Sequence, residues 1–313
     1  MSGSGVYESA LDLIGNTPIL HLKSFDRSGA ARIYAKLEFW SPGGSVKDRA
    51  ALSMIEDAEA RGLLKPGSTI VEPTAGNTGI GLALVGRLRG YRVILVVPEK
   101  YSREKRSIMR ALGGELVLTP TSEGMSGAIR KAQEIVAATP GALLPHQFEN
   151  HANPGAHYRT TAPEIERQME GRVDALVLGA GSGGTFTGVA RYFKERHPGV
   201  LTFMVESEGS VLGGGCAAPH RVEGIGSSFV PPILDRAMAD EILMVTDRDA
   251  FRTVARLARD EGVLVGGSGG AAACAAERVA PRLGAGKSEP APDRSLLRAA
   301  VCTLGVRLET SGG

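Results

Sequence analysis

The chain has 313 residues, which is enough for about two domains of ordinary size. Its 36 lysines and arginines and 34 aspartates and glutamates leave a formal charge of +2. The basic residues are scattered, so polyanion binding is excluded as the main function. No apolar run approaches the roughly 20 residues of a membrane span, and the first residues lack the basic and apolar regions of a signal peptide. We expect a soluble, cytoplasmic protein with no nucleic-acid or membrane partner.

Apolar runs alternate with amphipathic segments along most of the chain. The segments predicted as strands are 33–38, 69–72, 93–97, 115–118, 175–178, 202–205, 241–245 and 298–308. The segments predicted as helices are 46–61, 78–89, 103–112, 125–137, 185–196, 247–261 and 270–279. This alternation predicts an α/β protein with mostly parallel sheets covered on both faces. The segment 45–149 forms one set of strand and helix units, and residues 1–44 with 150–313 form a larger one.

Glycine is unusually frequent, with 42 residues in 313. Many of the glycines gather in short clusters, each after a β-like run and before a helical one. Such clusters are typical of loops that bind phosphates and cofactors. The three cysteines, Cys216, Cys274 and Cys302, lie far apart without a C-x-x-C pair, so we expect buried free thiols. The histidines match no metal-binding spacing, and we expect no metal site.

The first glycine cluster is Ser41-Pro42-Gly43-Gly44-Ser45-Val46-Lys47-Asp48-Arg49. It places Lys47 in the first turn of a helix, where the positive end of the helix dipole disfavours an ammonium group. A neutral lysine is what imine formation with an aldehyde cofactor requires. By itself, the pattern also suits a solvated lysine in a helix that needs a glycine-rich entry.

The second cluster is Pro73-Thr74-Ala75-Gly76-Asn77-Thr78-Gly79. It follows a predicted strand and opens a predicted helix, whose first N–H groups can bind a carboxylate or phosphate. A tight turn with a helix cap would have the same pattern.

The third cluster is Gly179-Ala180-Gly181-Ser182-Gly183-Gly184-Thr185-Phe186-Thr187-Gly188. Its glycines let the backbone approach a tetrahedral anion. A dinucleotide loop is a competitor, because Gly179, Gly181 and Gly184 satisfy G-x-G-x-x-G, and Glu206 or Glu208 could bind a ribose.

The combination of the three clusters favours one cofactor. A dinucleotide enzyme explains neither the lysine at a glycine-rich helix start nor the second anion loop. Two anion sites and one lysine fit pyridoxal 5'-phosphate, with its phosphate on the third cluster, its aldehyde on Lys47 and a substrate carboxylate on the second cluster.

The chain resembles the fold-type II pyridoxal-phosphate enzymes of the cysteine synthase and cystathionine β-synthase family. The resemblance covers about residues 8 to 284. The strings that carry it are Leu13-Ile14-Gly15-Asn16-Thr17-Pro18, Pro42-Gly43-Gly44-Ser45-Val46-Lys47-Asp48-Arg49, Glu72-Pro73-Thr74-Ala75-Gly76-Asn77-Thr78-Gly79, Asn153-Pro154-Gly155-Ala156-His157-Tyr158, Gly181-Ser182-Gly183-Gly184-Thr185, Glu223-Gly224-Ile225-Gly226 and Gly266-Gly267-Ser268-Gly269-Gly270-Ala271. It implies two doubly wound open-sheet domains with the cofactor in the cleft between them, the smaller one (45–149) mobile, and a homodimer.

The resemblance also implies roles for individual residues. Lys47 would hold the cofactor and act as the base at Cα. Asn77 would bind the ring 3'-oxygen, and Gly224 would line the pocket. The residues implied for the phosphate are Gly181, Ser182, Gly183, Gly184 and Thr185. Those implied for the substrate carboxylate are Thr74, Ala75, Gly76, Thr78 and Gln147.

The implied reaction is β-replacement on O-acetylserine or serine by a thiol, through an aminoacrylate. Homocysteine would give cystathionine, and sulfide would give cysteine. The resemblance is nearest to bacterial O-acetylserine-dependent cystathionine β-synthases. A plain cysteine synthase, a serine or threonine dehydratase and a catalytically silent family member are the alternatives.

The sequence departs from the family pattern in two places. Ala75 stands where relatives usually have serine, which removes one hydroxyl from the carboxylate loop. The C-terminal end also differs, and there Ser311 is our expected partner for the pyridine nitrogen, with Pro292-Asp293-Arg294-Ser295 as a rival match.

Overall fold

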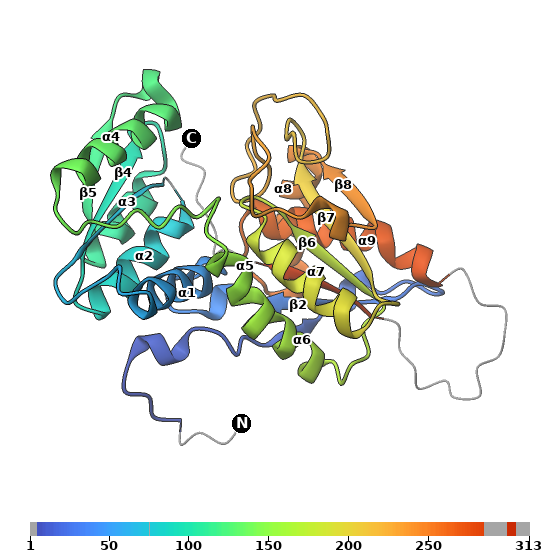
Figure 1. Ribbon diagram of the computed structural model, residues 1–313. Helices are drawn as coiled ribbons and strands as arrows, with labels where there is room; N and C mark the ends of the chain where they lie inside the picture. Colours follow the sequence, from blue (N-terminus) through green and yellow to red (C-terminus); the bar gives the residue numbers. More distant parts are fainter. Residues whose placement is uncertain (1–4, 75, 285–298, 305–313) are drawn as a thin grey trace. The chain divides into compact units, whose positions relative to one another are not determined.

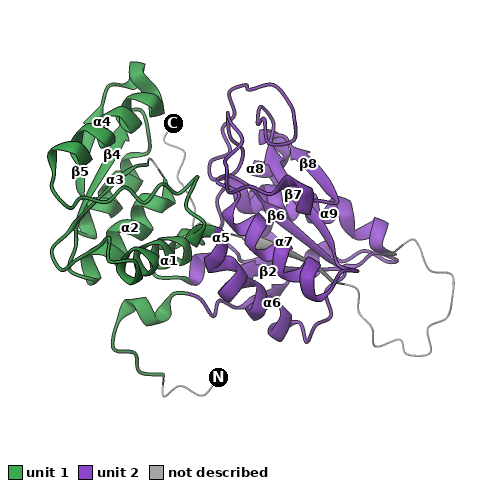
Figure 2. Cartoon of the chain, viewed as in Figure 1, with its two compact units in different colours: residues 1–14, 41–153 green, residues 15–40, 154–313 purple. Residues whose placement is uncertain are grey.

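The computed structural model describes residues 5–74, 76–284 and 299–304. The chain divides into two compact units (Figure 2). Unit 1 comprises Met1–Ile14 and Ser41–Asn153, and unit 2 comprises Gly15–Trp40 and Pro154–Gly313.

Unit 1 is built on a parallel sheet of three strands in the order β3, β4, β5 (Figure 1). The strands are β3 (Thr69–Pro73), β4 (Arg92–Pro98) and β5 (Glu115–Thr119). The helices are α1 (Lys47–Ala60), α2 (Asn77–Leu88), α3 (Arg103–Ala111) and α4 (Gly124–Ala138), with short 3-10 turns η1 (Ala10–Leu13) and η4 (Thr121–Glu123).

Alternate residues of β4 pack on opposite faces of this sheet. Val93, Leu95 and Val97 join a core formed with α1, α2 and α3. Ile94 and Val96 join a second core formed with α4. Successive side chains of a strand point to opposite faces, so a strand covered on both faces is a continuous apolar run. This explains why 93–97 is recognisable as a buried strand.

Unit 2 is built on a six-stranded sheet in the order β1-β2-β9-β6-β7-β8, in which only the β1–β2 pair is antiparallel. The strands are β1 (Ile19–His21), β2 (Arg32–Leu37), β6 (Ala175–Gly179), β7 (Leu201–Ser207), β8 (Glu241–Val245) and β9 (Ala299–Leu304). The helices are α5 (Ala152–Ala156), which crosses the boundary from unit 1, α6 (Ala162–Gln168), α7 (Gly184–Arg196), α8 (Asp247–Glu261) and α9 (Gly267–Gly284). The short 3-10 turns are η2 (Lys23–Phe25), η3 (Glu38–Trp40) and η6 (Arg236–Met238).

The two faces of this sheet are covered by different helix pairs. Val177 and Val205 pack in one core with α8 and α9. Leu176, Leu178 and Met204 pack in another core with α6 and α7. The predicted α/β class with doubly wound sheets is therefore confirmed.

Several glycines serve helix packing rather than loops. A Cβ on Gly270 would lie 2.3 Å from the carbonyl oxygen of Ala250, so α9 begins against the backbone of α8. A Cβ on Gly81 would lie 2.9 Å from the carbonyl oxygen of Lys47, and α2 approaches α1 in the same way. Glycine is thus frequent for two reasons, the loops at helix starts and the close packing of helices. The sequence pattern predicted only the first.

A helical segment from residue 152 to 168 is absent from the predicted elements. It consists of α5, a π-helical turn η5 (His157–Thr161) and α6. Pro154 suggested an interruption just after the predicted boundary at residue 149, but it lies in the first turn of α5, where a backbone N–H is not needed. The three-residue strand β1 was also missed, because so short a run carries no periodicity.

Cys216 is exposed, so the prediction that its thiol is buried was wrong, whereas Cys274 is buried and free as expected. Cys216 follows three glycines in a loop that packs little against the core. No helix in the described ranges is both long enough and apolar enough to span a bilayer.

Candidate functional site

Lys47 is the first residue of α1 and follows a glycine-rich turn. The hydroxyl of Ser45 accepts a hydrogen bond from the Lys47 N–H (3.2 Å), and the Asp48 carboxylate accepts one from the Gly43 N–H (2.6 Å). A Cβ on Gly43 would lie 2.3 Å from that carboxylate, and Gly44 has a φ of +78°. The turn therefore needs glycine at both positions.

The Lys47 side chain is partly buried. Loss of hydration lowers the pKa of its amine to about 8. The lowered pKa agrees with the reactive lysine that the sequence pattern suggested, but the cause is burial rather than the helix dipole. A substantial neutral fraction near neutral pH suits a lysine that forms an imine.

Four of the predicted substrate residues form two hydrogen-bonded pairs, one in the loop between β3 and α2 and one between α2 and Gln147. The N–H of Gly76 donates to the hydroxyl of Thr74 (3.3 Å), and the hydroxyl of Thr78 donates to the amide oxygen of Gln147 (2.6 Å). Thr74, Thr78 and Gln147 are buried. Asn77 begins α2, and its side chain makes no hydrogen bond to the part of the chain that the structure describes. Ala75 lies outside the described residues.

Glu72 is a site residue that sequence reasoning missed. It is the fourth residue of β3 and is almost fully buried, 2% exposed. Its carboxylate accepts hydrogen bonds from the N–H groups of His146 (3.2 Å) and Gln147 (3.4 Å), so it holds the turn that presents Gln147. Burial nevertheless raises the pKa of Glu72 to about 7. The only sequence signal was an acidic residue at the end of an apolar strand.

In unit 2, the third glycine cluster forms the turn from β6 into α7. Gly183 has a φ of +86°, and Gly184 is the first residue of the 13-residue helix α7. Thr185 is buried in the first turn. Backbone N–H groups at such a helix start have no partner within the helix and can bind an anion.

Gly224 lies against this turn. A Cβ on Gly181 would lie 2.7 Å from the carbonyl oxygen of Gly224, and Gly224 itself has a φ of +87°. Ser268, near the start of α9, lies beside Gly224, with its hydroxyl 3.4 Å from the position of a Gly224 Cβ. The structure thus places Gly224 beside Gly181 and adds a serine hydroxyl to which the sequence analysis gave no role. Ser311 lies outside the described residues.

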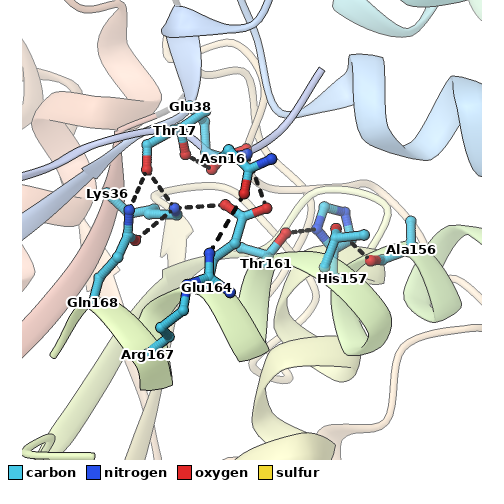
Figure 3. A network of polar contacts seen from close by, with 11 residues as sticks. Asn16, Thr17, Lys36, Glu38, Ala156, His157, Thr161, Glu164, Arg167 and Gln168 are labelled. Carbon is cyan, nitrogen blue, oxygen red and sulfur yellow. Dashed lines mark hydrogen bonds and ion pairs between the residues drawn. The ribbon is translucent and has the colours of Figure 1, made fainter. Parts of the chain in front are cut away.

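His157 is a further residue whose place the sequence did not reveal. It is buried, and it lies in the π-helical turn. Its Nδ1 is 3.0 Å from the hydroxyl of Thr161 (Figure 3). Its Nε2 is 3.2 Å from the hydroxyl of Thr185. His157 therefore connects the helical segment 152–168 to the α7 turn.

A cavity of about 660 Å³ lies elsewhere in unit 2, between α8 and α9. It is lined mainly by charged side chains, and it contains none of the predicted site residues. Within the described ranges, no group of three or more His, Cys, Asp or Glu side chains could hold a metal ion.

The parallel α/β units, the amine of lowered pKa and the glycine turn at the start of α7 are the features expected of one class of protein, an α/β enzyme that uses a lysine and binds a small anion. Residues 10–288 match the family of pyridoxal-phosphate dependent enzymes. The chain belongs to this family, whose cofactor is pyridoxal phosphate.

Three relatives illustrate the match. A probable cysteine synthase of Bacillus subtilis (strain 168) is 49% identical over 282 residues, which are 89% of this chain and 91% of the relative. An O-acetylserine-dependent cystathionine β-synthase of the same strain is 48% identical over 275 residues, 88% and 90% of the two chains. A crystal structure of the O-acetylserine-dependent cystathionine β-synthase from Helicobacter pylori has a TM-score of 0.88 and 43% identity, and covers 98% of each chain.

The residues present fit this cofactor. It carries an aldehyde, for which Lys47 supplies an amine with a pKa of about 8, and a phosphate, for which the α7 turn supplies helix N–H groups. A side chain at Gly181 would collide with Gly224, so the turn keeps its backbone bare for an anion. The dinucleotide alternative explains no reactive lysine, and the family match excludes it.

The buried carboxyl of Glu72 predicts a pH dependence of stability. Between pH 4.5 and 7 the native state holds a proton that the unfolded chain has released, so the free energy of unfolding falls as pH rises through this window, by up to about 3 kcal/mol. Glu72→Gln should abolish this fall. Urea unfolding of the apoprotein at a series of pH values measures it.

The matched control is Glu115→Gln on β5, whose carboxylate is exposed and pairs with Arg92. This variant should keep the fall between pH 4.5 and 7. An unchanged slope in Glu72→Gln would show that Glu72 is not the titrating group.

Proposed function

We propose that the protein catalyses β-replacement on O-acetylserine by a thiol. A carbon–sulfur bond forms at Cβ as the carbon–oxygen bond to acetate breaks, and the proton released by the thiol balances the acetate. Homocysteine would give cystathionine, and sulfide would give cysteine. The cysteine synthase and cystathionine β-synthase names of relatives at 48–49% identity support this reaction class.

The observation that carries the proposal is Lys47. It is the first residue of α1, after a turn that needs glycine, and burial lowers the pKa of its amine to about 8. The cofactor, when bound, delocalises the electron pair left at Cα as the proton departs. We assign Lys47 two tasks, to hold the cofactor's aldehyde carbon and to take the proton from Cα and return it. An amine with a pKa near the working pH serves both directions of proton transfer.

The substrate carboxylate is proposed to bind at the β3–α2 loop, on Thr74, Ala75, Gly76, Thr78 and Gln147. The hydrogen bond from Thr78 to the Gln147 amide oxygen leaves the amide NH₂ of Gln147 available as a donor. Asn77 is proposed to bind the ring 3'-oxygen, and Gly224 to line the pocket.

The phosphate is proposed to bind at the α7 turn, on Gly181, Ser182, Gly183, Gly184 and Thr185. Helix N–H groups and the partial positive charge at the helix start stabilise a bound dianion there.

Three further expectations remain predictions. The segment 45–149 is proposed to be the mobile, carboxylate-binding domain, and 1–44 with 150–313 the phosphate-binding one. The active form is proposed to be a homodimer. The cytoplasm is proposed as its location.

A first prediction concerns Lys47. Borohydride reduction of the cofactor-loaded protein should leave an adduct on Lys47, located by peptide mass spectrometry, and Lys47→Ala should leave none. Because only the neutral amine attacks the aldehyde, the rate of cofactor capture should rise with pH and level off above about 8. Lys65→Ala, at an exposed position, is the control and should behave as wild type. An adduct on another lysine would refute the assignment.

A second prediction concerns the partner of the pyridine nitrogen. Ser311 is the proposed partner, and Ser268, beside Gly224, is a second candidate from the geometry. Alanine at the true partner should shift the visible absorbance of the bound cofactor and lower kcat by roughly 10- to 100-fold, whereas alanine at the other serine should change neither. If neither variant changes the spectrum, both assignments fail.

A third prediction tests the reaction itself. Serine, O-acetylserine and O-phosphoserine are each combined with sulfide or homocysteine, and the products are identified by mass. O-acetylserine should give cystathionine, cysteine or both, and acetate should be released only with a thiol product. Cysteine alone would favour the plain cysteine synthase. Pyruvate formation that thiols do not divert would favour the dehydratase, and no turnover by the cofactor-loaded protein would favour a silent family member.

A further inference from the structure

Lys36 carries a fully buried ammonium group in β2, at 0% exposure. Its Nζ donates to the carbonyl oxygen of Thr17 (2.6 Å), the carboxylate of Glu164 (2.7 Å) and the amide oxygen of Gln168 (2.9 Å) (Figure 3). An ammonium has three protons, so this geometry gives each of them an acceptor. The mechanism proposed above uses none of these groups.

The other half of the pair is equally well held. The second carboxylate oxygen of Glu164 accepts a hydrogen bond from the N–H of Asn16 (3.0 Å). Asn16 has a φ of +46°, a conformation that costs free energy in a residue with a side chain. The amide NH₂ of Gln168 donates to the same Thr17 carbonyl (2.8 Å). The segment before β1 is thereby tied to α6 by contacts that span about 130 to 150 residues of sequence.

Glu164 lies seven residues, about two helical turns, after His157, the residue that contacts the α7 turn. Glu164 is in the first turn of α6, which directly follows the π-helical turn that holds His157. His157 reaches Thr185 on one side and Thr161 on the other. His157 and Thr161 are the first and last residues of the π-helical turn, and α6 continues directly from it, so the position of His157 depends on where α6 is held.

The segment 152–168 packs very closely against α7. A Cβ on Gly188 would lie 2.2 Å from the carbonyl oxygen of Pro154 and 2.8 Å from the Cβ of His157. The helical segment 152–168 and the start of α7 therefore touch backbone to backbone. A shift of this segment moves either Thr185 or its hydrogen bond to His157.

Holding two elements together with a buried ion pair requires the desolvation of two charges, which costs free energy. Removing one partner leaves an uncompensated charge, whereas replacing both by apolar residues is often neutral for stability. Such a pair contributes a unique geometry more than stability. The geometry that depends on the Lys36–Glu164 pair is the position of α6.

We propose that Lys36 and Glu164 are positioning residues for the phosphate-binding turn. The ion pair fixes α6, α6 fixes the π-helical turn, and His157 in that turn orients the hydroxyl of Thr185. The inference rests on the proposed function only in taking the α7 turn as the phosphate site.

The test compares Lys36→Met, Glu164→Met and the double variant with wild type. Three quantities are measured: the Kd for pyridoxal phosphate, the ³¹P chemical shift of the bound phosphate, and hydrogen exchange of the peptide 152–168. Each single variant should weaken cofactor binding by at least roughly tenfold, shift the ³¹P signal and speed exchange in 152–168. The double variant should bind the cofactor about as weakly as the single variants, because the pair that fixes α6 is gone even though no buried charge is left unpaired.

The matched control is Lys194→Met, which removes a partly exposed ion pair between α7 itself and Asp240. It should change none of the three quantities. If Lys36→Met does not fold, Glu164→Gln is measured in its place, because it removes the charge and keeps the shape; it should weaken binding in the same direction.

Wild-type Kd and ³¹P shift in a single variant would overturn the proposal. So would a double variant with wild-type Kd and ³¹P shift, since the loss in the single variants would then come from an unpaired buried charge and not from a lost geometry. Failure of the proposed function gives a different result. A wild-type protein that binds the cofactor but performs no β-replacement would refute the proposed reaction, and the binding measurements would still test the positioning role.

Discussion

A lysine amine kept partly out of water is the interaction on which the proposed chemistry depends. Lys47 starts α1, where Gly43 and Gly44 allow the entry turn, and Gly81 lets α2 approach its carbonyl to a distance that excludes any side chain. Burial then lowers the pKa of the amine to about 8. In the proposed mechanism, this lowered pKa is the source of the reactivity of the amine.

The α7 turn depends on glycine backbone that carries no side chains and on pairs of buried polar groups, and not on the burial of a single amine. Its glycines remove side chains from a helix start, and the contact of Gly181 with Gly224 fixes two loops that are 43 residues apart in sequence. Around this bare backbone the chain places buried polar groups in pairs: His157 with Thr185, and Lys36 with Glu164. Because each buried polar group needs a partner, such pairs specify one arrangement of the helices and limit the alternatives.

Most of the elements near the candidate site could be predicted because their signals are local. The strand 93–97 is apolar on both faces, and the helix from Asp247 to Glu261 has a capping threonine before it and a glycine after it. The clusters around Lys47, Thr74 and Gly181 combine glycines with donors at helix starts. The segment 152–168 could not be predicted, because Pro154 suggests an interruption, whereas its place in the first turn of α5 suits a helix.

The sequence by itself determined the class of fold, the cofactor and the residues expected to bind it, since glycine turns, helix starts and a lysine at one of them are encoded in short strings. Only the tertiary structure decided which distant residues act on them. The pKa of Glu72 depends on burial beneath the turn that carries Gln147. The places of His157, Ser268 and the Lys36–Glu164 pair depend on contacts across more than twenty residues of sequence. Desolvation and the pairing of buried polar groups arise only when the chain is packed, so no local sequence pattern predicts them.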